Sequence, residues 1–470
     1  MKKVFVNGDF NILHPGHLRL LKFAKESGDY LVVGLNNDKI NTKGVREQIR
    51  LESIQATSYV DEAFILNTPV LDYINEHQPD IVVKGKEHEL KENPELEIIN
   101  SYGGKLLFSS GMIGFSSIDL LKDEYLRVNT KIEHNNNYLK RHNINLTKLK
   151  NILEKFKELN VLVIGDTIVD EYITCEPLGM SQEDPTIVVS PLLTDKFIGG
   201  AAIVAGHART LGANVKFISV LGDDANYNYV ESGLKNLNIN VSLFKDTTRP
   251  TTLKQRFRAR DKTLLRVNHL KQHGISSDIQ ELIIKDILKD IDNINLIIFS
   301  DFSYGVLTNK LIDKITLIGK EKKIFMSADS QSSSQVGDIS KFKDMTLVTP
   351  TEREIRLSLN DFESGLIIIS DSLIKKTDTK YIFTTLGAEG VMIYNTNRDE
   401  LLTDNVQALA TNVKDVSGAG DSLLTCSSMA LCVGATVWES GYLGSIASAI
   451  QVSRMGNIPI SKADILKELS

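Results

Sequence analysis

The sequence predicts an α/β protein of two domains. The chain has 470 residues, which is more than one hydrophobic core usually supports. Short apolar runs alternate with segments in which apolar residues recur every three or four positions, the pattern of strands followed by helices. One polar, asparagine-rich segment, 130–146, interrupts this pattern and predicts a linker. The expected domains are therefore 1–129 and 147–470.

In the first domain, each expected strand is followed by a helix-like segment. Parallel strands need such crossovers, so the alternation predicts a parallel sheet wrapped by helices. The expected strands are 4–6, 30–35, 63–66, 80–83 and 105–108.

In the second domain, a helix over 147–159 leads into a strand at 161–166, and strands and helices then alternate. This number of elements suits one large α/β domain. The further strands expected are 215–222, 296–301, 324–329, 346–350 and 381–387.

The composition excludes several classes of function. Lys and Arg total 54 against 60 Asp and Glu, a formal charge of -6, so the chain has no overall cationic field to attract nucleic acid. Its first residues lack the pattern of a signal peptide, and no apolar run is long enough to span a bilayer. The 3 cysteines are too few for a disulfide framework. We expect a cytoplasmic protein without nucleic-acid or membrane partners.

Two histidines, His14 and His17, lie where the first strand turns into a helix, in the stretch VNGDFNILHPGH. A helix start presents unpaired N–H groups and the positive end of the helix dipole, which favour a phosphate. Two imidazoles at this place could hydrogen-bond an α-phosphate under attack. The alternative is that they only cap and pack the helix start.

Two later segments support the phosphate interpretation. Lys43 follows the second strand, where its ammonium would meet a leaving pyrophosphate. Ser116 and Ser117 precede a helical run, as a second N-cap and anion site. Taken singly, a lysine is usually solvated and a serine is usually only a cap.

These motifs resemble the HxGH nucleotidyltransferase family, which includes glycerol-phosphate cytidylyltransferases, over nearly all of residues 1–127. The resemblance implies a Rossmann-like domain in which His14 and His17 bind the triphosphate of ATP or CTP and Lys43 assists. One departure is Asn11, where the family usually has an aspartate. The resemblance also implies nucleotide contacts at Gly8, Phe10, Lys84, Gly85, Ser116 and Ser117.

A second motif, DVSGAGDSLLTCSSMAL over 415–431, combines a glycine-rich turn with a carboxylate at a helix start. Gly418 and Gly420 free the backbone to form an anion-binding nest that can hold a phosphoryl group in transfer. Asp421 is then placed to accept a hydroxyl proton. On its own this pattern is a weak signal, because glycine-rich turns before helices are common.

The order of this motif and two earlier ones resembles the ribokinase-like sugar kinases over residues 160–470. The earlier segments are GDTIVDEY (165–172) and GGAAIVAGHARTLGA (199–213). The likeness is greatest to the heptose 7-phosphate kinase half of bifunctional enzymes whose other half is an HxGH adenylyltransferase. It implies a ribokinase-like α/β domain with Asp421 as catalytic base and Gly418, Ala419 and Gly420 as the anion hole.

The same resemblance implies the remaining parts of a kinase site. An ATP site is implied at TLGAEG, with Thr385, Gly387 and Gly390, and Glu354 is implied to order Mg²⁺ and the phosphates. Two family asparagines are replaced, by Thr351 near the metal and by Ile203 near the sugar, so the sugar specificity is open. The implied sugar-site residues are Asp166, Asp170, Gly199, Gly200 and Asp301.

A cationic pattern can be interpreted without any family. Lys254, Arg256, Arg258 and Arg260 fall on alternate residues, so an extended segment would show all four on one face. Four adjacent cations suggest a polyanion, here an acceptor sugar that already carries a phosphate. The alternative is an edge strand whose charge discourages aggregation.

Together the two resemblances imply consecutive enzymes on one chain, with the two domains in reversed order. The kinase would convert heptose 7-phosphate to the 1,7-bisphosphate, and the transferase would convert heptose 1-phosphate and ATP to ADP-heptose and pyrophosphate. Two alternatives stay open. The first domain could use CTP to make a CDP-linked sugar or polyol, or one domain could be catalytically silent and act as a scaffold or sensor. We expect a homodimer.

Overall fold

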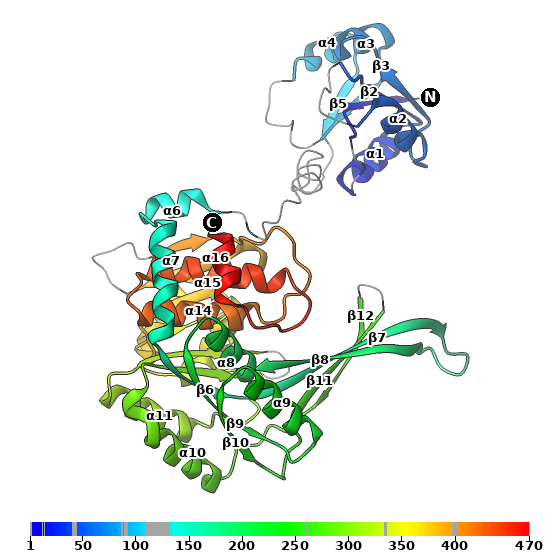
Figure 1. The fold of residues 1–470 in the computed structure, drawn as a ribbon. Helices are drawn as coiled ribbons and strands as arrows, with labels where there is room; N and C mark the ends of the chain where they lie inside the picture. The colour runs from blue at the N-terminus through cyan, green and yellow to red at the C-terminus, as the bar shows by residue number, and fades with distance from the viewer. Residues whose placement is uncertain are drawn as a thin grey trace. The chain divides into compact units, whose positions relative to one another are not determined.

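The chain divides into two units, 1–129 and 130–470, each with its own sheet and hydrophobic core (Figure 1). Both have the α/β class that the sequence predicts. No helix within the described residues has the length and apolarity needed to cross a bilayer. The computed structural model describes residues 2–11, 13, 15–39, 45–85, 88, 93–108, 132, 134–259, 262–332, 336–396 and 403–469.

A five-stranded parallel sheet carries the N-terminal unit. Its strands are β1 Lys3–Gly8, β2 Tyr30–Asn36, β3 Glu62–Leu66, β4 Ile81–Lys84 and β5 Lys105–Phe108. The described helices are α1 Pro15–Ser27, α2 Glu47–Gln55, α3 Val70–His77 and α4 Glu95–Ser101. The strand order β3-β2-β1-β4-β5 reverses between β1 and β4, and sheets of this kind bind ligands at the carboxyl ends of the strands beside the reversal.

A nine-stranded sheet forms the centre of the second unit, in the order β10-β9-β6-β13-β14-β15-β16-β17-β18. Its pairs are parallel from β10 to β16 and antiparallel at β17 and β18. The strands are β6 Asn160–Gly165, β9 Asn214–Leu221, β10 Asn240–Lys245, β13 Leu296–Asp301, β14 Phe325–Ser330, β15 Leu347–Val348, β16 Tyr381–Thr385, β17 Val391–Asn395 and β18 Thr403–Val406.

Helices cover both faces of this sheet. They are α6 Asn136–Arg141, α7 Leu146–Lys155, α8 Ala201–Thr210, α9 Ala225–Asn236, α10 Ser277–Asp290, α11 Asn309–Glu321, α12 Glu352–Leu359, α13 Leu366–Thr377, α14 Ala419–Cys432, α15 Val437–Val452 and α16 Lys462–Glu468. Val161 and Val163 of β6 belong to the core with α8, α14 and α15, whereas Leu162 and Ile164 belong to the core with α10, α11 and α13. Because both faces are apolar, the strands appear in the sequence as continuous apolar runs, and the strands expected from those runs are confirmed.

A second, four-stranded sheet was not expected from the sequence. It has the order β12-β11-β7-β8, with β7 Thr167–Met180, β8 Ile187–Gly200, β11 Thr252–Ala259 and β12 Lys262–His269. The outer halves of β7 and β8 project from the body of the unit as a long hairpin (Figure 1). Apolar residues there are exposed instead of packed on a core, so the sequence lacks the alternation that marks a strand on a core.

The expectation of a linker over 130–146 is wrong for the part that the structure describes. Tyr138 of α6 is fully buried, its hydroxyl donates a hydrogen bond to the carbonyl of Trp438 (3.0 Å), and its ring stacks on Tyr442. The His142 ring stacks on Trp438 at 4.3 Å and lies 2.7 Å from the carboxylate of Asp404. The segment looks polar because a few aromatic rings, not a regular apolar face, attach it to α15.

We predict that Tyr138→Ala destabilises the second unit by about 3–5 kcal/mol, because it empties a fully buried ring position. Tyr138→Phe keeps the ring and loses only one hydrogen bond, so it should cost about 1 kcal/mol. Trp438 is the one tryptophan of the chain, so its fluorescence during denaturant unfolding reports this unit. Equal unfolding midpoints for Tyr138→Ala and the parent protein would restore the linker interpretation.

Candidate active site

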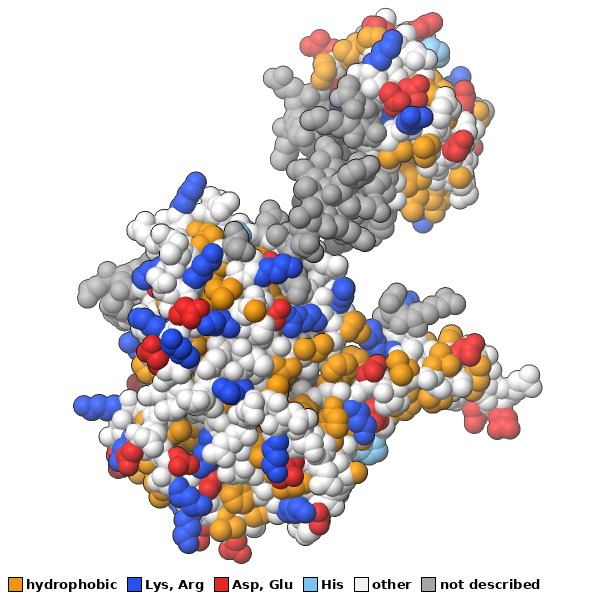
Figure 2. Space-filling model, viewed as in Figure 1, with side chains coloured by type: hydrophobic (Ala, Val, Ile, Leu, Met, Phe, Trp, Pro, Cys, Tyr) orange, Lys and Arg blue, Asp and Glu red, His pale blue; other side chains and the backbone are white. Residues whose placement is uncertain are grey.

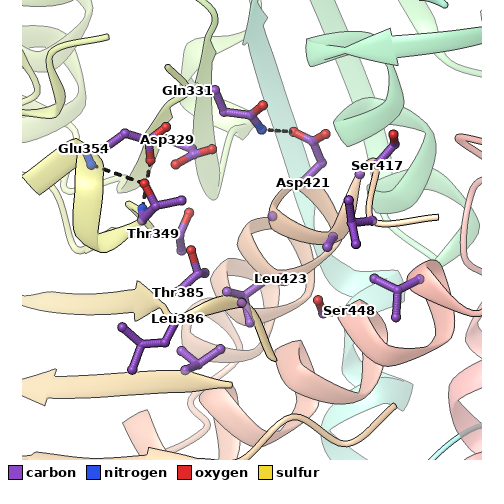
Figure 3. A pocket seen from close by; sticks show the side chains of 18 of the residues that line it. Asp329, Gln331, Thr349, Glu354, Thr385, Leu386, Ser417, Asp421, Leu423 and Ser448 are labelled. Atoms are coloured by element: carbon purple, nitrogen blue, oxygen red, sulfur yellow. Dashed lines mark hydrogen bonds between the residues drawn. The ribbon is translucent and has the colours of Figure 1, made fainter. Parts of the chain in front are cut away.

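A cavity of about 1090 Å³ opens in the second unit where the carboxyl ends of β14 and β16 meet the starts of α12 and α14 (Figure 3). Strands β7 and β11 of the second sheet contribute a further wall, through Asp170, Lys254 and Arg256. The two sheets therefore meet at one cavity, and the sequence-predicted sugar and nucleotide residues can be placed on its walls.

Asp421 lies in the first turn of α14 and is 4% exposed. Gly418, which caps this helix, has φ of 76° in the left-handed region, and a Cβ there would lie 2.6 Å from Oδ1 of Asn457. Only glycine fits that turn, and it lets Gly418, Ala419 and Gly420 line the cavity. The side-chain amide of Gln331 donates a hydrogen bond to Asp421 (3.2 Å; Figure 3). The structure thus brings the predicted anion hole and base together.

The electrostatics of Asp421 suit a general base. Burial, and to a smaller extent the nearby Asp170 carboxylate, raise the pKa of Asp421 to about 7, whereas the Lys254 ammonium acts in the opposite direction. A carboxyl group with a pKa near 7 can accept a proton at neutral pH and give it up again. Lys254 is 4% exposed, and its ammonium lies 5.3 Å and 5.4 Å from the ring centres of Phe302 and Tyr304.

Asp170 lies on the part of the cavity wall where the sequence predicts sugar binding. Its carboxylate forms an ion pair with Arg256 and accepts a hydrogen bond from the side-chain amide of Asn457 (3.1 Å). Gly200 lines the cavity, whereas Gly199 lies behind it, where a Cβ would come within 2.5 Å of the Asp170 carboxylate. Arg258 lies over the Tyr172 ring, 5.7 Å from its centre, and does not line the cavity.

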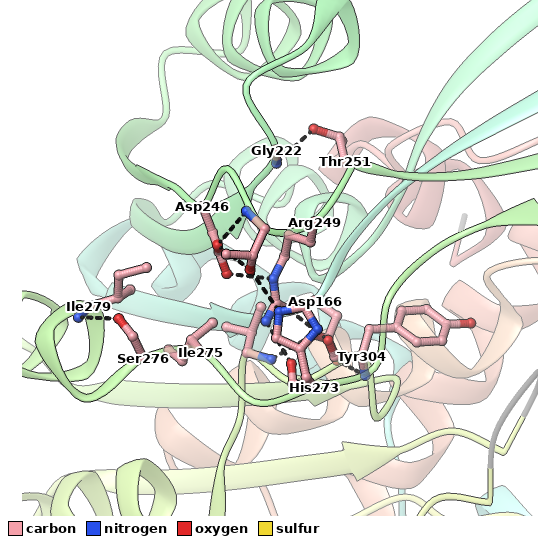
Figure 4. Close-up of polar contacts among 12 residues, drawn as sticks. Asp166, Gly222, Asp246, Arg249, Thr251, His273, Ile275, Ser276, Ile279 and Tyr304 are labelled. Atoms are coloured by element: carbon pink, nitrogen blue, oxygen red, sulfur yellow. Dashed lines mark hydrogen bonds and ion pairs between the residues drawn. The ribbon is translucent and has the colours of Figure 1, made fainter.

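Asp166 and Asp301 do not line the cavity, contrary to the expectation for sugar-site residues. The Asp166 carboxylate is buried and accepts hydrogen bonds from the backbone amides of Phe302, Tyr304 and Val306, which anchors that loop (Figure 4). Its pKa is raised to about 6, by burial and then by the charge of Asp301.

Asp301 likewise has partners within the protein. It accepts a hydrogen bond from the Ser330 hydroxyl (2.7 Å) and forms an ion pair with Lys341 (2.7 Å). Both aspartates therefore shape the loop that carries Phe302 and Tyr304, the rings that flank Lys254. Sequence position at a strand end did not distinguish such an anchor from a ligand contact.

At the nucleotide end, Thr385, Gly387 and Gly390 all line the cavity, as expected. Gly390 has φ of 100°, and a Cβ there would meet the Val406 carbonyl oxygen at 2.0 Å. Thr351 replaces a family asparagine and serves as N-cap of α12, in a capping box with Glu354. Ile203, the other replacement, is buried in α8 away from the cavity wall.

The carboxylates beside the nucleotide end fit a magnesium ion that is held mainly through phosphates. Glu354 accepts hydrogen bonds from the backbone amides of Ser332 (2.6 Å) and Thr351 (2.8 Å), so both of its oxygens already have partners. Asp329 lines the same wall, and its Oδ1 is buried without a hydrogen-bond partner in the described part of the chain. Burial, and then the charges of Glu354 and Asp421, raise the pKa of Asp329 well above its usual value.

The sequence analysis missed Asp329, Gln331 and Asn457. Asp329 and Gln331 lie at the end of an apolar run in the segment ADSQSSS, which by itself assigns no role to either residue. Asn457 follows α15 in a turn without a motif, so the sequence carried no signal for it. Among the described residues, no group of three or more His, Cys, Asp or Glu is placed to hold a metal ion.

In the N-terminal unit, the described site residues gather at the carboxyl ends of β1 and β4. Gly8 ends β1, and a Cβ there would lie 3.0 Å from the Phe10 ring, which in turn contacts the His17 ring at 4.9 Å. Lys84 ends β4 beside Gly85 and forms an ion pair with Glu95 (3.0 Å). His14, Lys43, Ser116 and Ser117 lie outside the described residues, as does Arg260.

Arg50, to which the sequence assigned no role, connects the loops that follow β1 and β2 by hydrogen bonds. It is 1% exposed and donates hydrogen bonds to the carbonyls of Asp9 and Val45 (both 2.7 Å) and to the carboxylate of Asp38 (3.0 Å). The backbone amide of Val45 donates to Oδ1 of Asn11 (3.1 Å). Asn11 thus performs a structural role here that needs no negative charge.

Comparison with protein families assigns the two units separately. The pfkB family of carbohydrate kinases matches residues 158–463, and a cytidylyltransferase-like family matches residues 5–101. The resemblances drawn from the motifs are thereby confirmed. The first match covers more than half of the chain.

Curated relatives and solved structures agree with these matches. The bifunctional protein HldE of Geotalea uraniireducens is 27% identical over 68% of this chain and 65% of its own length, and that of Helicobacter hepaticus is 30% identical over 66% and 64%. The chain thus spans a little less than two thirds of these relatives. Arabidopsis thaliana ribokinase has a TM-score of 0.52 at 17% identity, and Escherichia coli phosphofructokinase-2 has 0.54 at 16%, each covering 66% of this chain and 98% of its own. These likenesses confirm the ribokinase-like fold.

We predict that the rate of phosphorylation depends on pH through Asp421. Below a pH of about 7 the carboxyl is protonated and cannot accept the hydroxyl proton, so kcat/KM should rise through that pH and then level off. Lys254→Met removes the cation that lowers this pKa, so the rise should move to higher pH. The check is kcat/KM from about pH 5.5 to about pH 9.

The exposed Lys310→Met serves as the matched control and should leave the pH profile unchanged. A profile that is flat across neutral pH in the parent protein, or one that Lys254→Met shifts toward lower pH, would contradict the assignment of Asp421.

Proposed function

This chain belongs to the pfkB family of carbohydrate kinases, and on that premise we propose that its second unit transfers the γ-phosphoryl group of ATP to a sugar phosphate. One observation carries the proposal: a buried carboxylate with a pKa near 7 stands beside a glycine turn at a helix start, inside a cavity that also has a cationic wall. The proposed acceptor is heptose 7-phosphate and the product is the 1,7-bisphosphate.

In the proposed reaction, the acceptor hydroxyl lies between Asp421 and the γ-phosphorus. Its oxygen forms the new O–P bond, the bond from the γ-phosphorus to the β,γ-bridging oxygen breaks, and ADP leaves. Asp421 takes the hydroxyl proton. Backbone N–H groups at the start of α14 hold the negative charge of the phosphoryl group in transfer.

Mg²⁺ fits beside Asp329, with Glu354 fixing the loop that carries Ser332. When bound, the ion would neutralise charge on the phosphates. The protein residues do the rest: Asp170 and Asn457 orient the sugar, and Lys254 keeps the pKa of Asp421 from rising further.

For the N-terminal unit we propose nucleotidyl transfer at the carboxyl ends of β1 and β4. An oxygen of the sugar 1-phosphate attacks the α-phosphorus of ATP, the bond to the β-phosphate breaks, and pyrophosphate leaves. His17, with His14 and Lys43, holds the phosphates. The match to a cytidylyltransferase-like family and the HldE relatives support this assignment, and the proposed product is ADP-heptose.

We further propose a homodimer formed through the projecting hairpin. Apolar side chains are exposed along it, as Figure 2 shows in orange. A monomer seldom exposes so many together. The exposed residues are Leu178, Met180, Ile187, Val188, Leu192 and Leu193, with Leu264 and Leu265 on β12. The free cysteines Cys175, Cys426 and Cys432 suit the reducing cytoplasm that we propose as the location.

We predict that Asp421→Asn lowers kinase kcat by about two to four orders of magnitude and leaves ATP binding nearly intact, because the amide cannot accept the proton. The variant should still form the nucleotide sugar from a supplied sugar 1-phosphate. His17→Ala should do the reverse: it should still form the bisphosphate from heptose 7-phosphate but form no nucleotide sugar from the supplied 1-phosphate. Phosphorus NMR of the products distinguishes these results.

Separately inactive variants should complement one another in a mixture that also contains a phosphatase able to remove the 7-phosphate. The phosphatase is needed because the kinase product is the 1,7-bisphosphate and the proposed acceptor of the transferase is the 1-phosphate. Mixing Asp421→Asn with His17→Ala should therefore restore whichever steps each variant lacks. Loss of both activities in either folded variant would contradict two independent sites.

We predict that Leu192→Asp disrupts the proposed dimer, because it places a charge in the apolar contact. Light scattering after size-exclusion chromatography should give the mass of one chain for the variant and of two for the parent protein. Leu317→Asp, on the exposed side of α11, is the matched control and should stay dimeric. A monomeric parent protein would exclude the dimer.

A further inference from the structure

The three described cations of β11 are not equivalent. Arg256 is paired with Asp170, so its charge is balanced within the protein. Lys254 lies beside two aromatic rings and lowers the pKa of Asp421. Arg258 lies over the Tyr172 ring and away from the cavity wall. Each of these three cations therefore already has a contact within the protein, so none of them depends on a ligand for its only partner.

The neighbouring strand β12 supplies a different cation, Arg266. Its side chain lines the cavity, and in the antiparallel pairing of β11 and β12 it lies directly opposite Arg256. Residues opposite one another in such a pair project on the same face of the sheet. Within the described part of the chain, Arg266 has no ion pair and no side-chain hydrogen bond, and its side chain is exposed to the solvent of the cavity.

Two guanidinium groups placed opposite one another repel, and such a pair destabilises a sheet unless an anion lies between them. Asp170 balances only one of the two charges. A guanidinium presents a planar fork of N–H donors that fits a phosphate with two parallel hydrogen bonds. Among the described residues, the charge of Arg266 is therefore not balanced by a carboxylate, and a ligand phosphate would balance it.

The position of Arg256 and Arg266 also indicates whether they bind a phosphate of the nucleotide or one on the acceptor sugar. Lys254, whose charge acts on Asp421, is two residues before Arg256 on β11, which is about 6.6 Å along the strand. An anion at Arg266 would thus lie next to the ion pair of Arg256 with Asp170, the part of the cavity wall that we assign to the sugar.

We propose that Arg266 is the residue that selects a phosphorylated acceptor, by binding the phosphate at the end of the sugar remote from the reacting hydroxyl. This proposal rests on the proposed kinase function and adds its specificity determinant. The acceptor class is a sugar monophosphate long enough to place its phosphate at β12 while its hydroxyl contacts Asp421. Arg256 contacts the same phosphate, and its ion pair with Asp170 keeps the Arg256 side chain oriented.

The test compares heptose 7-phosphate with unphosphorylated heptose as acceptors for the full-length chain. In Arg266→Ala, KM for heptose 7-phosphate should rise about 10- to 100-fold, the range for losing a charged hydrogen-bonding partner, while KM for ATP stays unchanged. The kcat/KM for unphosphorylated heptose should not fall. Arg266→Lys keeps the charge without the fork and should give an intermediate KM.

The matched control is Lys262→Ala, which removes a cation at the other end of β12, away from the cavity wall. It should leave both acceptors unaffected. A parent enzyme that prefers heptose 7-phosphate and an Arg266→Ala variant that keeps this preference would overturn the role of Arg266 and leave the proposed function standing. A parent enzyme that uses both acceptors equally would overturn the proposed substrate class and this inference with it.

Discussion

A carboxylate buried at the start of a helix is the constraint on which the kinase unit depends. Burial disfavours the charged form of Asp421 and raises its pKa to about 7. The Asp170 carboxylate adds to this rise, and the Lys254 ammonium opposes it. The glycine turn at Gly418 allows the helix to begin there, because any side chain would collide with Asn457. The pKa of about 7 that burial gives Asp421 suits its proposed role as a base at neutral pH.

The second sheet supplies the charges that this balance needs. It brings Asp170 from β7 and Lys254 from β11 near Asp421 of α14, although these three residues are far apart in the sequence. The same sheet continues outward as an apolar hairpin, so one element provides a wall of the cavity and the surface for a proposed dimer. Dimer formation and acceptor binding would then involve the same strands.

Behind the cavity, a set of buried polar groups holds its aromatic wall. Asp166 anchors the loop 302–306 by three backbone hydrogen bonds, and Arg249 donates to the carbonyl of Tyr304 (2.8 Å) and forms an ion pair with Asp246 (Figure 4). This loop carries the rings that flank Lys254. Residues that do not line the cavity thus hold the rings beside Lys254, the ammonium that lowers the pKa of Asp421.

By itself, the sequence determined the α/β class, the positions along the chain of the strands that are buried on both faces, and the glycine turn with Asp421. Those features depend on neighbouring residues in the chain. A continuous apolar run favours a strand that is buried on both faces, and a glycine before a helix allows the left-handed turn found there. Only the tertiary structure decided which polar residue at a strand end faces the cavity. Asp166 and Asp170 are four residues apart, yet one anchors a loop and the other faces the sugar site, because their surroundings come from distant segments. The pairing of Arg266 with Arg256 and the attachment of Tyr138 to α15 likewise depend on contacts between segments that no local pattern records.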